Sequence, residues 1–271
     1  MKTGQSQTIA IDQLGGNMPS GSASVKNRVP RISLRGIRKT FGSIEALRGV
    51  DLDVYPGECV GLIGDNAAGK STLTKIISGT YVPDAGTITV DGEEVQFSNP
   101  SDARIRNIEM VFQDLSLCDH IDVMGNLFLG REMSRWSFLD RRSMHTQARK
   151  MLDDLDIRIP RLNAKVEQLS GGQRQAIAIA RAASFEPRVL IMDEPTSALA
   201  VAEVEAVLRL INEVKSRGVA VILITHRLQD LFEVCDRIAV MYEGTKVAER
   251  SIGKTSLEDL VKLIVGKGAE I

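Results

Sequence analysis

The most constraining feature of the chain is residues 64–71, which read Gly-Asp-Asn-Ala-Ala-Gly-Lys-Ser and fit the pattern G-x-x-x-x-G-K-[ST]. An apolar run at residues 59–63 precedes this pattern and predicts a buried strand. Residues 70–78 follow, with Leu73, Ile76 and Ile77 at helical spacing. A strand, a glycine-rich turn and a helix in this order predict a phosphate-binding loop in an α/β fold.

The residue types in this loop suit phosphate chemistry. Gly64 and Gly69 let the backbone curl so that several N–H groups point into one concavity. The following helix adds about half a positive charge at its N-terminus. Lys70 brings a full charge to the β- and γ-phosphates, and the Ser71 hydroxyl can bind Mg²⁺. The alternative is a glycine-rich turn before an ordinary helix, and the loop alone indicates only that a nucleoside triphosphate binds.

Length and charge exclude several classes of protein. The 271 residues fit one large α/β domain or a domain with a subdomain. The net charge of −1 leaves no electrostatic footprint for nucleic acid or an anionic membrane surface. Cys59, Cys118 and Cys235 lie far apart without metal-binding spacing, which favours reduced thiols in a cytosolic protein. No apolar run approaches a membrane span and the first residues do not form a signal peptide, so a membrane role needs a separate partner.

The order of elements divides the chain. Residues 1–29 are rich in Gly, Ser, Asn and Gln and predict a flexible tail, so the domain is expected at residues 30–271. Strands are expected at residues 31–37, 44–47, 50–54, 86–90, 94–97 and 108–112, the fourth and fifth joined as a hairpin at Asp91 and Gly92. Phe41 is expected in a turn after the first strand, where it either stacks on adenine or belongs to the core.

Residues 114–186 predict a helical insertion between two strands of the core. The helical segments are residues 123–129, 141–155 and 173–185, and no strand pattern interrupts them. Near the end of the insertion stands Leu169-Ser170-Gly171-Gly172-Gln173, directly before a strongly helical run. Ser-Gly-Gly at a helix start exposes N–H groups and the positive end of the helix dipole, and so predicts a second anion site. An N-cap serine with flexible glycines is the alternative. Because the chain has one nucleotide loop, the second site is expected to serve the nucleotide of another copy.

Two further strands carry polar residues at their ends. Residues 189–192 are apolar and deliver Asp193 and Glu194 to the end of a buried strand. A carboxylate there can hold Mg²⁺, and its neighbour can polarise the attacking water. A strand-ending turn explains Pro195 but not two adjacent carboxylates. Residues 219–224 end at His226, which can contact a phosphate, and Gln113 at another strand end can reach Mg²⁺ or water.

Taken in order, these motifs resemble the nucleotide-binding subunit of ATP-binding cassette (ABC) transporters over residues 30–266. The resemblance implies a P-loop NTPase fold with an antiparallel β subdomain and an inserted helical subdomain. It also implies that two copies close face to face around two ATP molecules. The nucleotide-binding set is then Phe41, Gly64, Asp65, Asn66, Ala67, Ala68, Gly69, Lys70, Ser71 and Thr72 in one copy, with Ser170, Gly171, Gly172 and Gln173 in the other. The implied catalytic set is Glu194 as base, His226, Gln113 and Lys70, and the implied Mg²⁺ set is Ser71, Gln113 and Asp193.

The resemblance has one departure of consequence and one finer indication. Ala200 stands where the family usually has Asp, which is expected to weaken communication between the two ATP sites without removing activity. Ala67 replaces a more frequent glycine at a variable position. Residues 113–132, 140–142 and 260–266 resemble the ATPases of ribose, xylose and fructose uptake systems. They imply an ATP-hydrolysing importer subunit acting as a homodimer on transmembrane permease subunits, and indirectly with a solute-binding protein. Its implied place is the cytoplasmic face of the cell membrane.

Three alternatives remain open at this stage. One is a soluble ABC ATPase acting on DNA or ribosomes, and another is an importer subunit for a solute other than a sugar. The third is a nucleotide sensor without catalytic activity, if Ala200 affects the ATP sites more than expected. No coiled-coil arm, zinc cysteine set or second cassette supports a nucleic-acid role.

Overall fold

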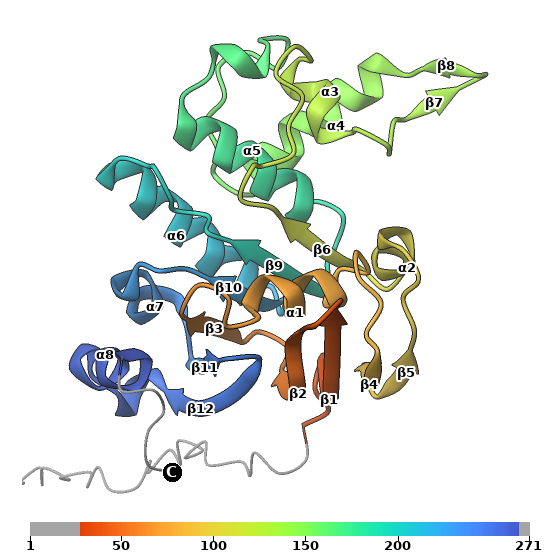
Figure 1. The fold of residues 1–271 in the computed structure, drawn as a ribbon. Coiled ribbons are helices and arrows are strands. Elements are labelled where there is room, and N and C mark those ends of the chain that lie inside the picture. Colours follow the sequence, from red (N-terminus) through yellow and green to blue (C-terminus); the bar gives the residue numbers. More distant parts are fainter. Residues whose placement is uncertain (1–27, 266–271) are drawn as a thin grey trace, which may run out of the picture.

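The computed structural model describes residues 28–265. A six-stranded sheet with the order β12-β11-β3-β10-β9-β6 forms the centre, and a four-stranded antiparallel sheet with the order β2-β1-β4-β5 lies beside it (Figure 1). The central strands are β3 (Cys59–Gly64), β6 (Ile108–Val111), β9 (Val189–Asp193), β10 (Ala220–Ile224), β11 (Arg237–Tyr242) and β12 (Thr245–Ser251). All neighbours in this sheet are parallel except β11 and β12. The predicted P-loop-type α/β architecture is therefore present.

The antiparallel sheet corrects two details of the prediction. Its strands are β1 (Ile32–Phe41), β2 (Ile44–Val54), β4 (Ala85–Val90) and β5 (Glu93–Val95). Phe41 is the last residue of β1 and not part of a turn, and it pairs with Ile44. β2 is one strand rather than two, because Gly49 absorbs the irregularity with φ +103° and the pairing to β1 continues across it. Asp91 and Gly92 form the predicted turn between β4 and β5 with φ of 50° and 83°.

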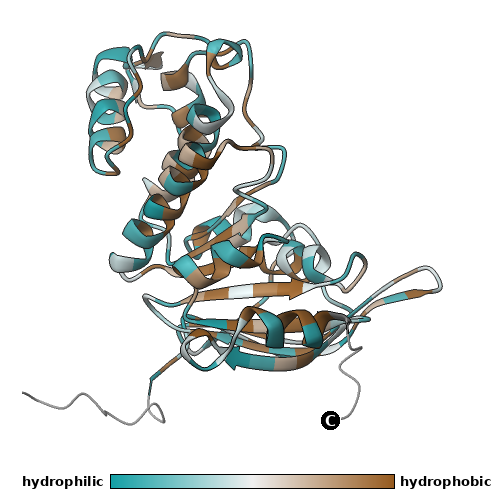
Figure 2. Ribbon diagram, turned by 90° about the vertical axis from the view of Figure 1, so that its left-hand side faces the viewer, coloured by the Kyte–Doolittle hydropathy of each residue, from teal (hydrophilic) through white to brown (hydrophobic). Residues whose placement is uncertain are grey.

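Two hydrophobic cores lie on the two faces of the central sheet. One is enclosed by the antiparallel sheet, α1 (Lys70–Ile77) and α2 (Pro100–Ile105), and includes Leu34, Leu73 and Ile222. The other joins the opposite face to the helices α3 (Val123–Leu127), α4 (Arg141–Asp153), α5 (Gly171–Ala183), α6 (Val201–Ser216), α7 (Leu228–Val234) and α8 (Leu257–Val265). Figure 2 shows the central strands coloured mostly as hydrophobic, as burial on both faces requires.

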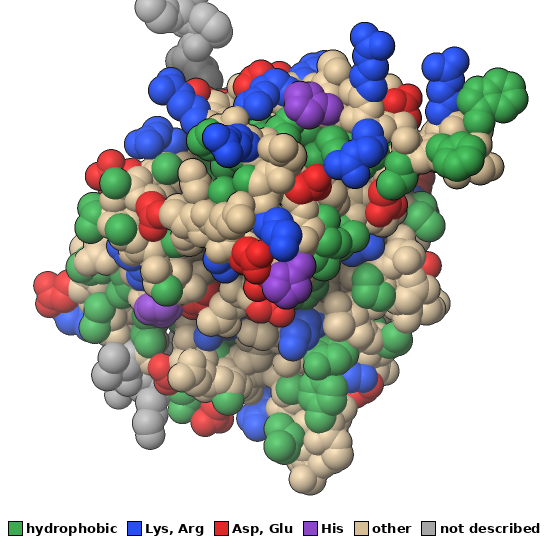
Figure 3. All heavy atoms as spheres, turned by 90° about the horizontal axis from the view of Figure 1, so that it is seen from above, with side chains coloured by type: hydrophobic (Ala, Val, Ile, Leu, Met, Phe, Trp, Pro, Cys, Tyr) green, Lys and Arg blue, Asp and Glu red, His purple; other side chains and the backbone are tan. Residues whose placement is uncertain are grey.

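The helical insertion is present, but a strand pair interrupts it. β7 (Ser134–Arg135) and β8 (Phe138–Leu139) form a short hairpin through Trp136 and Ser137, both with positive φ. The sequence shows no strand period here because each strand has two residues and nothing buries either face. Trp136 is 86% exposed and Phe138 79% exposed. Figure 3 shows hydrophobic side chains projecting from the surface at this end of the molecule.

The remaining boundaries differ little from the prediction. α5 begins at Gly171 rather than residue 173, α3 and α4 end two residues early, and single-turn 3₁₀ segments stand at Val166–Gln168 and Ile252–Lys254. Among residues 28–265, no helix is both long enough and apolar enough to cross a bilayer. The expected flexible tail falls almost wholly on residues 1–27, which lie outside the described part of the chain.

Candidate functional site

The phosphate-binding pattern lies at the carboxyl end of β3, between β10 and β11 and directly before α1. A Cβ on Gly64 would lie 2.1 Å from the carbonyl oxygen of Met241, and a Cβ on Gly69 would lie 2.7 Å from that of Ala46. Both glycines also have positive φ, +148° and +96°. The neighbouring backbone therefore requires glycine at both positions. This requirement is independent of any phosphate that approaches the loop.

A second hairpin, not singled out from the sequence, supports this loop. The turn between β11 and β12 places the Gly244 N–H 3.1 Å from the carbonyl oxygen of Ala68, while the Gly244 carbonyl accepts from Arg48 at 2.8 Å. Gly244 has φ +79°, and a Cβ there would lie 2.8 Å from the Ala46 carbonyl oxygen. The turn thus connects the loop to β2 and limits its movement.

Lys70 provides the positive charge of the loop. Its Nζ donates to the carbonyl oxygens of Gly64 at 2.7 Å and Asp65 at 2.9 Å. Burial lowers the pKa of Lys70, while the carboxylates of Glu194 and Asp193 act in the opposite direction. The ammonium group therefore lies within electrostatic reach of the carboxylates at the end of β9, two strands away from β3 in the sheet.

Asp193 and Glu194 end β9 at the same edge of the sheet. Burial, with a contribution from Glu194, raises the pKa of Asp193, and Lys70 and Lys75 oppose this rise. A partly buried carboxylate with a raised pKa favours a cation beside it. The described residues contain no group of three or more His, Cys, Asp or Glu side chains able to cage a metal. Mg²⁺ is usually held by one or two carboxylates with substrate phosphates, so this donor set fits it.

Glu194 and His226 form a direct pair. Glu194 has φ +53°, and its N–H donates to the carbonyl oxygen of Ile224 at 2.9 Å. Its Oε2 lies 2.7 Å from His226 Nδ1, and the Glu194 side chain is 15% exposed whereas that of His226 is 71% exposed. Backbone strain of this kind concentrates at functional sites. The register of β9 on β10 brings these two residues together, 32 positions apart in sequence.

The remaining residues predicted for this edge make no hydrogen bond or ion pair with the Glu194–His226 pair in the described part of the chain. Gln113 is exposed and follows β6, whose Val111 pairs with Met192 of β9, so the two chain segments leave the sheet side by side. Ser71 is exposed in the first turn of α1. The Phe41 ring packs edge-on against Tyr81 with centroids 5.1 Å apart, and its residue is 41% exposed. The core alternative for Phe41 is therefore wrong, and adenine stacking stays a prediction.

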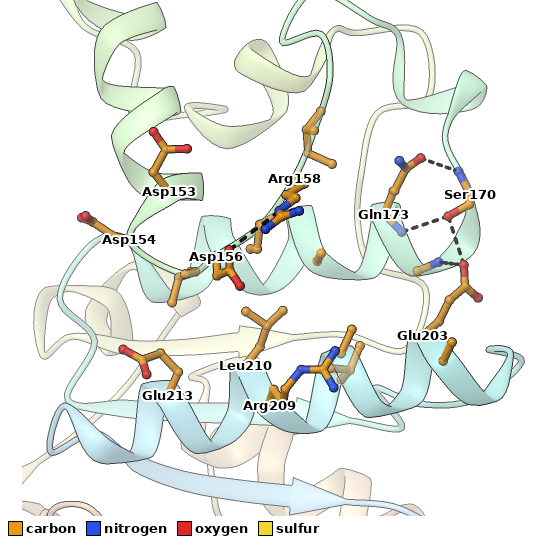
Figure 4. Close-up of a pocket in the computed structure, with 18 residues that line it drawn as sticks. Asp153, Asp154, Asp156, Arg158, Ser170, Gln173, Glu203, Arg209, Leu210 and Glu213 are labelled. Atoms are coloured by element: carbon orange, nitrogen blue, oxygen red, sulfur yellow. Dashed lines mark hydrogen bonds and ion pairs between the residues drawn. The ribbon is translucent and has the colours of Figure 1, made fainter.

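The Ser-Gly-Gly segment lies beside a cavity that the phosphate-binding loop does not line. Ser170 is the N-cap of α5, where its Oγ accepts from the Gln173 N–H at 3.2 Å and its own N–H donates to Gln173 Oε1 at 3.0 Å. A cavity of about 610 Å³ opens beside Ser170, Gly172 and Gln173 (Figure 4). Residues from α4 to α6 and their connections line this cavity, and none of residues 64–72 does. Ser170 is therefore an N-cap, as the alternative reading expected, and the cavity also leaves one side of the segment open.

Three residues that sequence reasoning missed shape these sites. Arg181 of α5 donates to the carbonyl oxygens of Leu115 and Ser116, at 2.9 and 2.8 Å, just beyond Gln113. Asn126, fully buried, holds both the N–H and the carbonyl of Cys118. Glu203 of α6 accepts from Ser170 and Gly172. The first two carry a weak sequence signal, a polar side chain within an apolar helix, and Glu203 carries none.

Comparison with known proteins agrees with this geometry. The sequence model of the family described as "ABC transporter" matches residues 47–197. A xylose/arabinose import ATP-binding protein of Sulfolobus acidocaldarius is 44% identical, over 86% of this chain and 93% of that protein. A fructose import ATP-binding protein of Rhizobium meliloti is 43% identical, over 88% and 94%. A ribose import ATP-binding protein of Burkholderia cenocepacia is 42% identical over 88% of this chain, which spans about half of that protein's length, 47%.

Solved structures give the same result for the fold. A nucleotide-free ATP-binding cassette from an ABC transporter superposes with a TM-score of 0.75 at 26% identity, covering 88% of this chain and 95% of that one. A dimeric bacterial ABC transporter cassette superposes with a TM-score of 0.70 at 27% identity, covering 82% and 98%.

Proposed function

The chain belongs to the ABC transporter family, and on that premise we propose that it is the ATP-hydrolysing subunit of a sugar importer and works as a homodimer. The observation that carries the proposal is the meeting, at one edge of the central sheet, of the phosphate-binding loop and the Glu194–His226 pair. The charges of Lys70 and Asp193 act on one another there. This arrangement supports the proposal that phosphate binding and water activation occur in one region.

We assign the residues the following roles, which their positions support. Residues 64–72 surround the phosphates with backbone N–H groups and the Lys70 charge, and Phe41 offers an aromatic face for adenine. Glu194 accepts the proton of the attacking water, and His226 orients the Glu194 carboxylate and reaches the γ-phosphate. Ser71, Asp193 and Gln113 would hold Mg²⁺, which when bound neutralises charge on the phosphates.

The homodimer accounts for the separation of the two anion sites. Each chain has one lysine-bearing loop and one Ser170–Gly172 segment, and the cavity beside that segment contains none of residues 64–72. Two copies arranged head to tail would set each segment against the partner's nucleotide, so that Ser170, Gly171, Gly172 and Gln173 complete the partner's site. One of the similar solved structures is described as a dimeric cassette.

The substrate and the membrane partners are inferred from the relatives. Their names specify import of xylose or arabinose, fructose and ribose. We therefore propose that this subunit drives monosaccharide uptake through separate permease subunits at the cytoplasmic face of the membrane, with a solute-binding protein acting on the far side.

The catalytic proposal is tested with Glu194→Gln. We expect ATP hydrolysis by the purified protein to fall by about 10²–10⁴-fold, because the general base is lost while the side chain keeps its size. The variant should also accumulate an ATP-bound dimer in size-exclusion chromatography. Glu205→Gln is the matched control, because Glu205 is 65% exposed on α6 and, among residues 28–265, its one ion pair is with Arg209 at 4.0 Å. Equal hydrolysis by the wild type and Glu194→Gln would overturn the assignment of the base.

The substrate proposal is tested by transport. Vesicles containing the permease subunits of a sugar importer, loaded with ATP and this subunit inside, should take up a labelled pentose or fructose and not a labelled amino acid. Uptake of the amino acid alone would contradict the sugar assignment.

A further inference from the structure

The anion site at the start of α5 already contains an anion of the same chain. Glu203 Oε1 accepts from the Ser170 hydroxyl at 3.0 Å and from the Gly172 N–H at 3.1 Å. Figure 4 shows the Glu203 side chain rising from α6 toward Ser170. These two donors belong to the segment proposed above to complete the ATP site of the partner, where the γ-phosphate is the anion they would meet. A carboxylate and a phosphate oxygen cannot use both donors at once.

The approach of Glu203 depends on glycine. A Cβ on residue 172 would lie 2.7 Å from the Cδ of Glu203, which is closer than side chains tolerate. Gly172 therefore permits an acidic group to sit directly over the first turn of α5. The backbone is shaped for close contact with an anion, and in the isolated chain Glu203 makes that contact.

The second oxygen of the same carboxylate reaches another helix. Glu203 Oε2 accepts from the Ala200 N–H at 3.2 Å. Ala200 stands at the N-cap of α6 and has no side chain able to cap it. Hydrogen bonds from the N–H groups of Ala200 and Gly172 and from the Ser170 hydroxyl lower the pKa of Glu203, so the group is a carboxylate at neutral pH. Glu203 thus connects the start of α5 with the segment that follows Glu194.

We propose that Glu203 is an internal competitor for the Ser170–Gly172 anion site, and that its displacement by the partner's γ-phosphate sets the ATP concentration at which two copies close. This inference rests on the proposed homodimer and concerns the regulation of that same site. Displacement also releases the Ala200 N–H, so arrival of the partner's nucleotide is transmitted to residues 197–200 beside Glu194. The hydrogen bond between Glu203 and the Ala200 N–H thus connects the two ATP sites in this chain, where the alanine side chain at position 200 is unable to do so.

The test uses the full chain carrying Glu194→Gln, which is expected to form a stable ATP-bound dimer. The double variant Glu194→Gln/Glu203→Gln keeps the shape of the side chain and removes its charge. We expect its half-saturating ATP concentration for dimerisation, measured by analytical ultracentrifugation, to be roughly tenfold lower, within the usual range of coupling between sites. The affinity of the monomer for a fluorescent ATP analogue should not change, because residues 64–72 are untouched.

The controls separate charge removal from damage to α6. Glu194→Gln/Glu205→Gln removes a charge two residues along the same helix and should leave the threshold unchanged. Glu194→Gln/Glu203→Asp keeps the charge on a shorter side chain and should move the threshold less than the Gln variant does. Far-UV circular dichroism confirms that each variant folds.

Three results would overturn the inference. An unchanged threshold in the Glu203→Gln protein would show that the carboxylate does not compete. A higher threshold would show that Glu203 supports the site rather than blocks it. If neither Glu194→Gln nor the double variants form a dimer at any ATP concentration, the proposed homodimer itself fails and the inference fails with it.

Discussion

Gly64→Ala is a sharp test of how the sheet holds the phosphate-binding loop. The new Cβ would lie 2.1 Å from the Met241 carbonyl oxygen, where real Cβ contacts stay above 3.0 Å, so β3 and β11 must separate by about 0.9 Å. Residue 64 also has φ +148°, which alanine rarely adopts. The backbone strain is worth about 1–3 kcal/mol and the overlap about 1–3 kcal/mol, so we expect a loss of about 2–6 kcal/mol in the free energy of unfolding.

Gly218→Ala is the matched control for this change. Gly218 also has a positive φ, +86°, but a Cβ there meets nothing within 4 Å. The control should lose only about 1–2 kcal/mol, the strain of a left-handed alanine. Urea unfolding followed by circular dichroism gives both values, and titration with a fluorescent ATP analogue should show weakened binding only for Gly64→Ala. Equal losses in the two variants, or unchanged nucleotide binding by Gly64→Ala, would refute the steric argument.

Three further predictions concern contacts outside the loop. Arg237→Met should lower the free energy of unfolding by about 2–4 kcal/mol, because it removes the guanidinium that pairs with Glu58 and leaves Glu249 with Lys246 alone. Although burial opposes it, hydrogen bonding from Lys246 and the Arg237 charge lower the pKa of Glu249. The contribution of Glu249 to the free energy of unfolding is therefore complete above its ordinary pKa of 4.5 and is lost as the pH falls through its lower pKa in the folded protein. This pH dependence of the free energy of unfolding should shrink in Arg237→Met but not in Arg250→Met. Asn126→Ala should lower the thermal midpoint through a loss of about 2–4 kcal/mol, since it removes buried hydrogen bonds to Cys118, and a midpoint equal to wild type would contradict that. Cys59 should resist iodoacetamide at neutral pH until the protein unfolds, because hydrogen bonding with Cys235 and burial raise its thiol pKa, and rapid labelling of the native protein would contradict this.

Much of the fold follows from short-range patterns. The strand before the loop, the helix after it and the apolar run ending at Asp193 are each set by residues within a few positions of one another, so periodicity and local motifs predict them. The N-cap geometry at Ser170 is equally local, since its partner Gln173 is three residues away. The pairing of Glu194 with His226 could be anticipated because the parallel strands β9 and β10 end at one edge of the sheet.

Tertiary packing decided the features that lack a local signal. The hairpin at Trp136 is a two-residue strand pair, too short for any period, and β2 continues past Gly49 because β1 pairs with both of its parts. Glu203 meets Ser170 across 33 positions because α5 packs on α6, and no rule of spacing selects one glutamate among those of α6. The sequence by itself determined the phosphate-binding pattern and the groups that we propose for hydrolysis. Only the tertiary structure decided which carboxylate lies over the second anion site, because that choice depends on how two helices pack.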